Sequence, residues 1–192
     1  MEDVDLGVCK ARWYAGDADR VAVVLPGALY VPFAPLLWFA REVALARGWS
    51  VLEVWDEYRD RSEDPWRWVF DRAEAALRYA GDAGRALVTK SISSRAVTMA
   101  VELGLPGIWL TPLLRDEEIA TGFEQLSAPA LLVGGTADES WDGALARRAG
   151  HEVLELEGAN HALQIEGDPF ASIDALRLVV ERMDDFVAAL GP

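Results

Sequence analysis

Residues 85–95 read RALVTKSISSR, so a short apolar run passes directly into a serine and then into residues typical of a helix start. The run at 85–89 predicts a buried strand, and the polar residues after it favour a helix. Ser91 is therefore expected on a sharp turn between a strand and a helix. Such a turn holds a serine hydroxyl above the end of a sheet, and it requires small residues two positions away on each side, here Thr89 and Ser93.

The same alternation of apolar runs and amphipathic segments extends along the chain. The Asp-Pro pairs at 64–65 and 168–169 are strong signals for helix starts, because Asp caps a helix and Pro suits its first position. Strands alternating with helices predict an α/β three-layer sandwich, with a mostly parallel sheet of about six strands flanked by helices. Strands are expected at 21–25, 51–55, 85–89, 108–110, 130–133 and 153–156, and helices at 35–47 and 65–80, from about 92, 116 and 142, and from 169 onward. Residues 4–13 are considered as a further edge strand.

Size and charge narrow the classes of function. A chain of 192 residues without repeats or linkers fits a single domain over 1–192. A net charge of −14 argues against a nucleic-acid partner and against anionic membranes. The uncharged stretch 21–40 is long enough for a membrane span, but its prolines favour a strand, a turn and a helix start instead. A lone cysteine, Cys9, and an acidic N-terminus suggest a soluble cytoplasmic protein.

A carboxylate and a histidine follow two later strands. The strand at 130–133 leads into GGTAD, which ends at Asp138, and the strand at 153–156 leads into GANH, which ends at His161. Open α/β sheets place their ligands at the carboxyl ends of parallel strands, so we expect Ser91, Asp138 and His161 to converge there. Taken singly, Asp138 could be a turn residue and His161 a structural polar group. The other histidine, His151, begins a strand instead of ending one.

These motifs resemble those of small bacterial α/β-hydrolases without a cap domain. TKSIS at 89–93 is similar to the G-K-S-L-G elbow of that family, with Lys90 and Ser91 retained and both glycines replaced. The G-T-x-D element at 135–138 and the G-x-x-H element at 158–161 follow in the family's chain order of Ser, Asp and His. The resemblance runs from Val21 nearly to the end of the chain. It implies the α/β-hydrolase fold and a serine hydrolase acting on a small ester or thioester, without cofactor or metal.

The resemblance also implies an oxyanion hole and an open site. The two backbone N–H donors are expected from Ile92, next to the nucleophile, and from Ala28, in the loop after the first parallel strand. Only residues 111–115 separate the strand at 108–110 from the next helix, which leaves no room for a cap. Tyr30, Trp109 and Trp141 are expected near the rim, where they would line an acyl pocket.

Three other readings of the sequence are open. Ser93 could replace Ser91 as nucleophile, although its own flanking residues are Ser91 and the bulky Arg95. The non-glycine elbow could belong to a catalytically inactive α/β-hydrolase fold that serves as a binding or interaction protein. A flavodoxin-like or Rossmann-type cofactor binder is disfavoured, because no G-x-G-x-x-G follows the first parallel strand.

Overall fold

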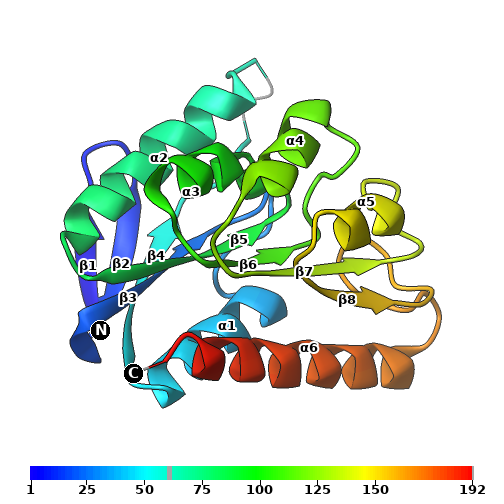
Figure 1. The fold of residues 1–192 in the computed structure, drawn as a ribbon. Coiled ribbons are helices and arrows are strands. Elements are labelled where there is room, and N and C mark those ends of the chain that lie inside the picture. The colour runs from blue at the N-terminus through cyan, green and yellow to red at the C-terminus, as the bar shows by residue number, and fades with distance from the viewer. Residues whose placement is uncertain (60–61, 192) are drawn as a thin grey trace.

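The computed structural model describes residues 1–59 and 62–191 and contains one mixed sheet with helices on both faces (Figure 1). In this part of the chain the sheet has eight strands, in the order β1-β2-β4-β3-β5-β6-β7-β8. The strands are β1 (Glu2–Asp5), β2 (Lys10–Tyr14), β3 (Asp17–Leu25), β4 (Trp49–Trp55), β5 (Gly84–Lys90), β6 (Gly107–Leu110), β7 (Ala130–Gly135) and β8 (Glu152–Leu156). The expected alternation of strands and helices is confirmed.

The strand count exceeds the expected six because the N-terminal segment adds a hairpin. β1 and β2 pair antiparallel, with Val4 opposite Ala11, and β2 pairs antiparallel with β4. The turn between them includes Gly7 at φ 83°, a backbone conformation that glycine adopts without strain. The expectation of a single edge strand at 4–13 was therefore wrong. The six strands from β4 to β8 in the sheet order are parallel, as predicted.

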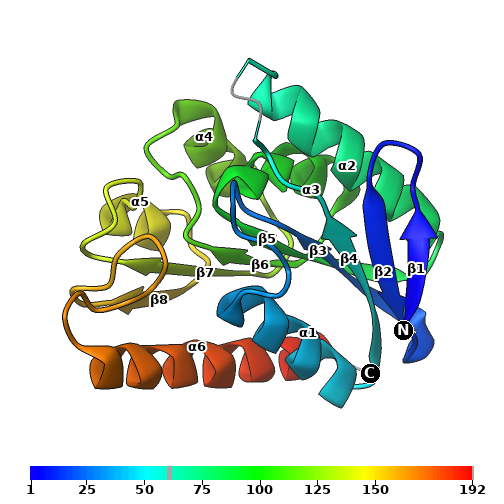
Figure 2. The same ribbon diagram turned by 180° about the vertical axis from the view of Figure 1, so that it is seen from behind.

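Helices form the two outer layers. α1 (Pro35–Ala46) and α6 (Pro169–Ala189) cover one face, as Figures 1 and 2 show. The opposite face carries α2 (Pro65–Ala80), α3 (Val97–Leu103), α4 (Glu117–Gln125) and α5 (Gly143–Arg148). Aspartates cap four of these helices through side-chain oxygens that accept backbone N–H bonds, namely Asp64, Asp116, Asp142 and Asp168. Each cap satisfies donors that the first turn of a helix leaves unpaired.

The central strands are apolar throughout because both of their faces are covered. Val23 of β3 packs into the core beneath α2 and α3, and its neighbour Val24 packs into the core beneath α1 and α6. This alternation is the two-residue period of a strand. Among the helices of the described residues, none has the length and apolar character needed to cross a membrane.

The strand order creates a switch point at β3. This strand pairs with β4 on one side and with β5 on the other, so the chain runs from β3 to β4 in one direction along the sheet and then crosses β3 to continue at β5 in the other. Parallel sheets open a crevice at the carboxyl ends of the strands at such a point. The first and third parallel strands, β3 and β5, are paired, and this pairing brings the loop after Leu25 beside Lys90 and Ser91.

Candidate active site

Ser91 stands on a strained turn directly after β5. Its φ is 54°, a left-handed conformation that is rare for residues other than glycine, asparagine and aspartate. A short 3₁₀ segment, Ser91–Ala96, then leads into α3. Thr89 and Ser93 at the flanking positions are both fully buried, so the turn forms with small residues other than glycine. The sharp strand-to-helix turn expected from the sequence is present.

The hydroxyl of Ser93 points away from this turn into the protein. Its Oγ donates a hydrogen bond of 2.5 Å to the carbonyl oxygen of Pro26, and only 1% of the residue is exposed. A buried hydroxyl that is already committed to a backbone carbonyl is not available as a nucleophile. The geometry therefore disfavours Ser93 and leaves Ser91 as the candidate.

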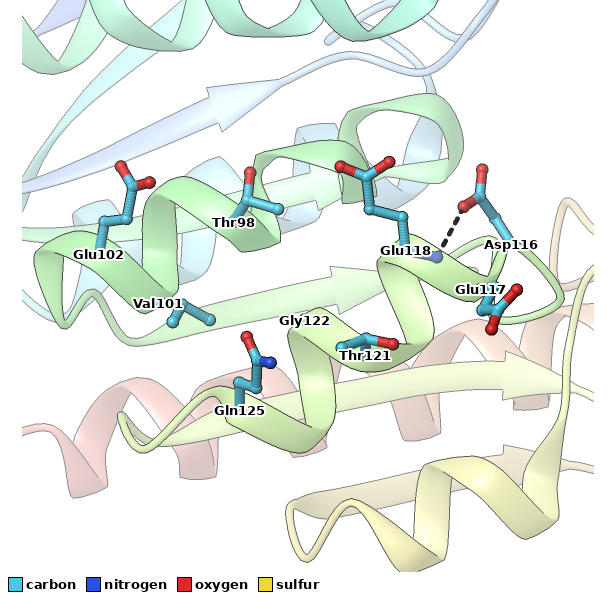
Figure 3. Close-up of a pocket in the computed structure, with 9 residues that line it drawn as sticks. All are labelled: Thr98, Val101, Glu102, Asp116, Glu117, Glu118, Thr121, Gly122 and Gln125. Carbon is cyan, nitrogen blue, oxygen red and sulfur yellow. Dashed lines mark hydrogen bonds between the residues drawn. The ribbon is translucent and has the colours of Figure 1, made fainter.

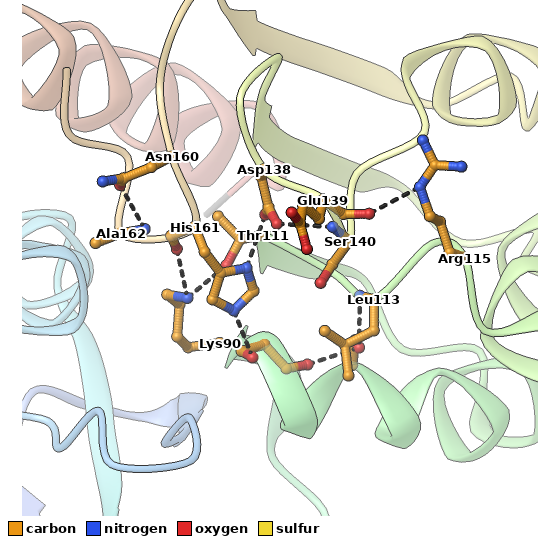
Figure 4. A network of polar contacts seen from close by, with 12 residues as sticks. Lys90, Thr111, Leu113, Arg115, Asp138, Glu139, Ser140, Asn160, His161 and Ala162 are labelled. Carbon is orange, nitrogen blue, oxygen red and sulfur yellow. Dashed lines mark hydrogen bonds and ion pairs between the residues drawn. The ribbon is translucent and has the colours of Figure 1, made fainter. Parts of the chain in front are cut away.

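Three side chains from distant stretches of the chain meet beside this turn (Figure 4). His161 Nε2 lies 2.7 Å from Ser91 Oγ, and His161 Nδ1 lies 2.7 Å from Asp138 Oδ2. A carboxylate can only accept, so Nδ1 carries the ring proton and Nε2 accepts from the serine hydroxyl. The second carboxylate oxygen of Asp138 accepts the backbone N–H of Ser140 at 2.9 Å. This arrangement can deprotonate the serine as it attacks a carbonyl group.

The loops that carry the acid and the base are tied to each other. Ala137 N–H donates to the carbonyl oxygen of Ala159 at 3.0 Å, and Gly158 N–H donates to Thr136 Oγ1 at 2.7 Å. The turn after the histidine is closed by Asn160, whose Oδ1 accepts the N–H groups of Ala162 and Gln164. These bonds hold the acid and the histidine in register with each other.

Solved structures share this architecture at low sequence identity. Est1E from Butyrivibrio proteoclasticus is 12% identical, with a TM-score of 0.76 over 98% of this chain and 97% of that chain. XC6422 from Xanthomonas campestris, described as an α/β serine hydrolase without lid, is 13% identical with a TM-score of 0.74 over 100% of this chain and 94% of that chain. The chain has the α/β-hydrolase fold. The Pyrococcus furiosus esterase Pf2001 is also similar, at 12% identity and a TM-score of 0.73 over 94% of this chain and 87% of that chain. No protein-family model matches the sequence, and neither does any curated protein.

Burial and hydrogen bonding act in opposite directions on Asp138. Burial disfavours the charged carboxylate, but the hydrogen bonds from His161 and from the Ser140 backbone outweigh it, so the pKa of Asp138 lies below its ordinary value. Asp138 therefore stays ionised at neutral pH. The side chain of Asp138 is 2% exposed and that of His161 is 41% exposed, so the imidazole faces the solvent while the carboxylate is enclosed behind it.

A cleft of about 860 Å³ opens in this α/β-hydrolase fold above Ser91. Ala28, Ile92 and Tyr30 all line it, the first two being the expected oxyanion donors. Gly27 and Tyr30 exchange two backbone hydrogen bonds that close the loop around Ala28. The hydroxyl of Tyr30 accepts the N–H of Leu36 at 3.1 Å and anchors this loop to α1. Residues 111–116 connect β6 to α4 without a cap.

The two tryptophans expected at the rim lie in the core instead, which corrects that expectation. Trp109 of β6 is fully buried and packs edge-on against Phe123 of α4, with ring centroids 5.1 Å apart. Trp141 is 4% exposed, packs on Gly134 and donates its indole N–H to Glu155. The side chain of Trp109 lies on the face of the sheet that α4 covers, and the ring of Trp141 packs against Gly134 in β7. Of the three predicted pocket residues, Tyr30 alone lines the cleft above Ser91.

A second hollow of about 630 Å³ lies between α3 and α4 (Figure 3). Carboxylates dominate it, from Glu102, Asp116, Glu117 and Glu118, and no serine, cysteine or histidine is among its described lining residues. Within 1–59 and 62–191, no group of three His, Cys, Asp or Glu side chains is placed to hold a metal ion. The chemistry-bearing residues therefore gather in the cleft above Ser91.

One further residue of the site was not expected from the sequence. No role in the site was assigned to Lys90 from its sequence position, but its Nζ donates to the carbonyl oxygen of His161 at 3.0 Å and to Thr111 Oγ1 at 2.5 Å. Burial lowers the pKa of Lys90 to about 7, although the negative charge of Asp138 acts in the opposite direction. A cation at the end of an apolar strand was the available signal, because such a residue is rarely buried without a specific partner.

Proposed function

We propose that this protein is a serine hydrolase that cleaves a small ester or thioester through an acyl-enzyme on Ser91. The observation that carries the proposal is the 2.7 Å approach of Ser91 Oγ to His161 Nε2, with the serine held at a φ of 54° in the lining of a cleft. A hydrogen bond of this length puts the base within reach of the proton it must remove. The esterases and serine hydrolases among the structural neighbours support the same activity.

In the proposed acylation step, Ser91 Oγ attacks the substrate carbonyl carbon while His161 Nε2 takes the hydroxyl proton. The imidazolium then gives that proton to the leaving alcohol or thiol as the bond to it breaks. Water then loses a proton to the same nitrogen and attacks the acyl carbon. The imidazolium returns this proton to Ser91 Oγ as the bond between Oγ and the acyl group breaks and the acid leaves. Because its pKa is lowered, Asp138 stays charged, and the carboxylate stabilises the imidazolium.

The tetrahedral intermediate carries a negative oxygen that needs donors. We assign this role to the backbone N–H groups of Ala28 and Ile92. Both residues line the cleft with Ser91, and they sit at the ends of the neighbouring strands β3 and β5. Ile92 also belongs to the first turn of the 3₁₀ segment, whose free N–H groups favour negative charge.

The shape of the cleft favours a substrate of modest size that enters from solvent. The short connection 111–116 leaves the cleft open, and Leu29, Tyr30 and Leu113 give it an apolar lining next to the nucleophile. The alternative considered above, a catalytically inactive binding protein, predicts an unstrained backbone at the turn that carries Ser91. The left-handed φ of Ser91 argues against this reading, because the strain that an active elbow requires is present.

A fluorophosphonate probe tests the proposal. Wild-type protein is expected to be labelled and Ser91→Ala is not, and Ser127→Ala, which changes an exposed serine before β7, serves as the matched control. Chromogenic acyl esters and acyl thioesters of increasing chain length then measure hydrolysis. Labelling of Ser91→Ala at the wild-type rate would overturn the assignment of the nucleophile. Folded wild-type protein that neither labels nor hydrolyses any ester would favour the inactive binding protein.

A further inference from the structure

Lys90 contacts three of the segments that surround the candidate nucleophile. Its Nζ bonds to Thr111, at the end of β6, and to the backbone carbonyl of His161 (Figure 4). Its aliphatic chain packs on Gly27 in the loop expected to supply an oxyanion donor, since a Cβ at Gly27 would lie 3.0 Å from Lys90 Cγ. Nζ also lies 5.1 Å from the ring centroid of Tyr30. The side chain of Lys90 therefore contacts both the loop that contains Gly27 and Tyr30 and the loop that contains His161.

We propose that Lys90 is a positioning residue that fixes the backbone of the histidine loop at the height where the imidazole reaches Ser91. The inference rests on the function proposed above. The ring of His161 is oriented by Asp138 at one nitrogen and by Ser91 at the other, and the hydrogen bonds within the loop act on residues before and after His161. The bond from Lys90 Nζ adds a restraint at the carbonyl group of His161 itself.

Thr111 makes this restraint rigid. Its φ is 45°, it is fully buried, and its N–H donates to the carbonyl of Val133 in β7 at 2.7 Å. The Thr111 hydroxyl, which accepts the hydrogen bond from Lys90 Nζ, therefore belongs to a residue that is bonded to the sheet itself. A continuous series of hydrogen bonds runs from β7 through Thr111 and Lys90 to the backbone of His161.

If Lys90 only filled space, its replacement would have a different effect on activity. Methionine has nearly the length of lysine and would fill the same volume without burying a charge, so a lysine that only filled space would be replaceable at no cost to activity. A positioning lysine is not replaceable in this way, because methionine cannot donate a hydrogen bond to the His161 carbonyl.

The kinetic test compares Lys90→Met with the wild type and with Arg85→Met. Arg85 lies at the opposite end of the same strand, so its replacement controls for the loss of a cation from β5. We expect Lys90→Met to lower kcat for ester hydrolysis by about 100-fold with little change in KM, because misplacing a base by about 1 Å has an effect of that size. Arg85→Met is expected to keep the wild-type kcat.

A pair of variants at Thr111 tests the same restraint while keeping the lysine. Thr111→Val removes the hydroxyl that anchors Nζ and keeps the branched shape, and we expect kcat to fall by about tenfold. Thr111→Ser keeps the hydroxyl and is expected to restore most of the rate. Equal rates for the valine and serine variants would contradict the proposed series of hydrogen bonds.

A spectroscopic measurement separates this inference from the proposed function. The chain has two histidines, so ¹⁵N-histidine labelling gives one ring signal set for His161 and one for His151. His151 Nε2 lies 2.9 Å from the Phe123 carbonyl and serves as an internal reference. Lys90→Met is expected to shift the His161 signals and to leave those of His151 in place.

The outcomes are distinct. If wild-type protein hydrolyses esters and Lys90→Met keeps kcat within about threefold, Lys90 does not position the base. If wild-type protein hydrolyses no ester, the proposed function has failed, and the His161 signals still decide the role of Lys90. Unchanged His161 signals in Lys90→Met overturn the inference in that case, and a selective shift of these signals supports it.

Discussion

Gly135, at the end of β7, lies directly against the carbonyl oxygen of Ala159 in the histidine loop. A Cβ atom on Gly135 would stand 2.1 Å from that oxygen, far inside the distance at which two atoms can touch without repulsion. The loop after β8 therefore closes over the end of β7 only because residue 135 has no side chain. This close approach explains the glycine in the G-T-x-D element. The backbone does not require it, because Gly135 does not have a positive φ.

We predict that Gly135→Ala moves the histidine loop and disables the site. The added methyl group must displace Ala159, and His161 follows two residues later, so kcat/KM is expected to fall by about 100-fold. Overpacking at this contact is expected to lower the free energy of unfolding by about 2 kcal/mol. Ester hydrolysis and urea unfolding of the same preparation measure both effects.

Gly122→Ala is the matched control for this change. A Cβ there would lie 2.6 Å from the side-chain atom Val97 Cγ1 between α4 and α3, so it also overpacks a contact, at a place away from Ser91. We expect a similar loss of stability with wild-type activity per folded molecule. An equal loss of activity in both variants would show that Gly135 matters only for stability.

Replacing Asp138 by asparagine tests the charge of the acid at nearly constant shape. The amide cannot stabilise the imidazolium, and it can hold the histidine in the wrong tautomer, so kcat is expected to fall by about 10³- to 10⁴-fold. Because the pKa of Asp138 is lowered in the folded protein, ionised Asp138 stabilises the fold above its unfolded pKa, and this contribution is lost as the pH falls through the folded value.

Acid titration of unfolding checks the second part of that prediction. The stability difference between wild type and Asp138→Asn is expected to shrink below the ordinary pKa of an aspartate. A difference that stays constant from neutral pH down to acid unfolding would mean that Asp138 is not held as a carboxylate.

The Ser93→Ala variant is expected to remain an active enzyme. Its hydroxyl is buried and bonded to the Pro26 carbonyl, so the change is expected to lower the free energy of unfolding by about 1 kcal/mol through a lost hydrogen bond. Labelling by a fluorophosphonate should continue at Ser91, and peptide mapping of the labelled protein locates the adduct. An adduct on wild-type protein that vanishes in Ser93→Ala would identify Ser93 as the nucleophile.

Lys90 also predicts how stability varies with pH. Its pKa is lowered to about 7 by burial, so between this value and the ordinary 10.5 the unfolded chain binds a proton that the folded chain does not. Wild-type stability is therefore expected to rise with pH through this window, by up to about 5 kcal/mol relative to Lys90→Met. Below pH 7 the lysine is charged in both states, and the full cost of burying it remains.

Urea unfolding of both proteins at several values between pH 6 and pH 10 measures this difference. Lys90→Met is expected to be the more stable protein at pH 6, with the gap narrowing as the pH rises. Parallel curves for the two proteins would mean that Lys90 keeps its ordinary pKa in the folded state.

Local signals and the direction of parallel strands were enough to predict much of the fold. The Asp-Pro pairs at 64–65 and 168–169 marked the starts of α2 and α6, where capping chemistry is independent of tertiary context. The meeting of Ser91, Asp138 and His161 followed from one rule, that the carboxyl ends of parallel strands share an edge. Their catalytic roles remain proposals.

Side-chain direction was the part that the sequence did not determine. Trp109 was expected at the rim because it lies near the end of β6, but a strand alternates its side chains, and this indole lies in the core on the face that α4 covers. The contact between Lys90 and the His161 carbonyl joins residues 71 positions apart, and no local pattern encodes it. The β1–β2 hairpin was missed for a similar reason, because short exposed strands carry little hydrophobic alternation.

The bonds from Ala137 to Ala159 and from Gly158 to Thr136 join the loops that carry Asp138 and His161 into a single mechanical unit. A displacement of one loop therefore carries the other loop with it and preserves the contact between the Asp138 carboxylate and the His161 imidazole. In its neutral form the imidazole consequently keeps its proton on Nδ1, so that Nε2 is the nitrogen that faces Ser91.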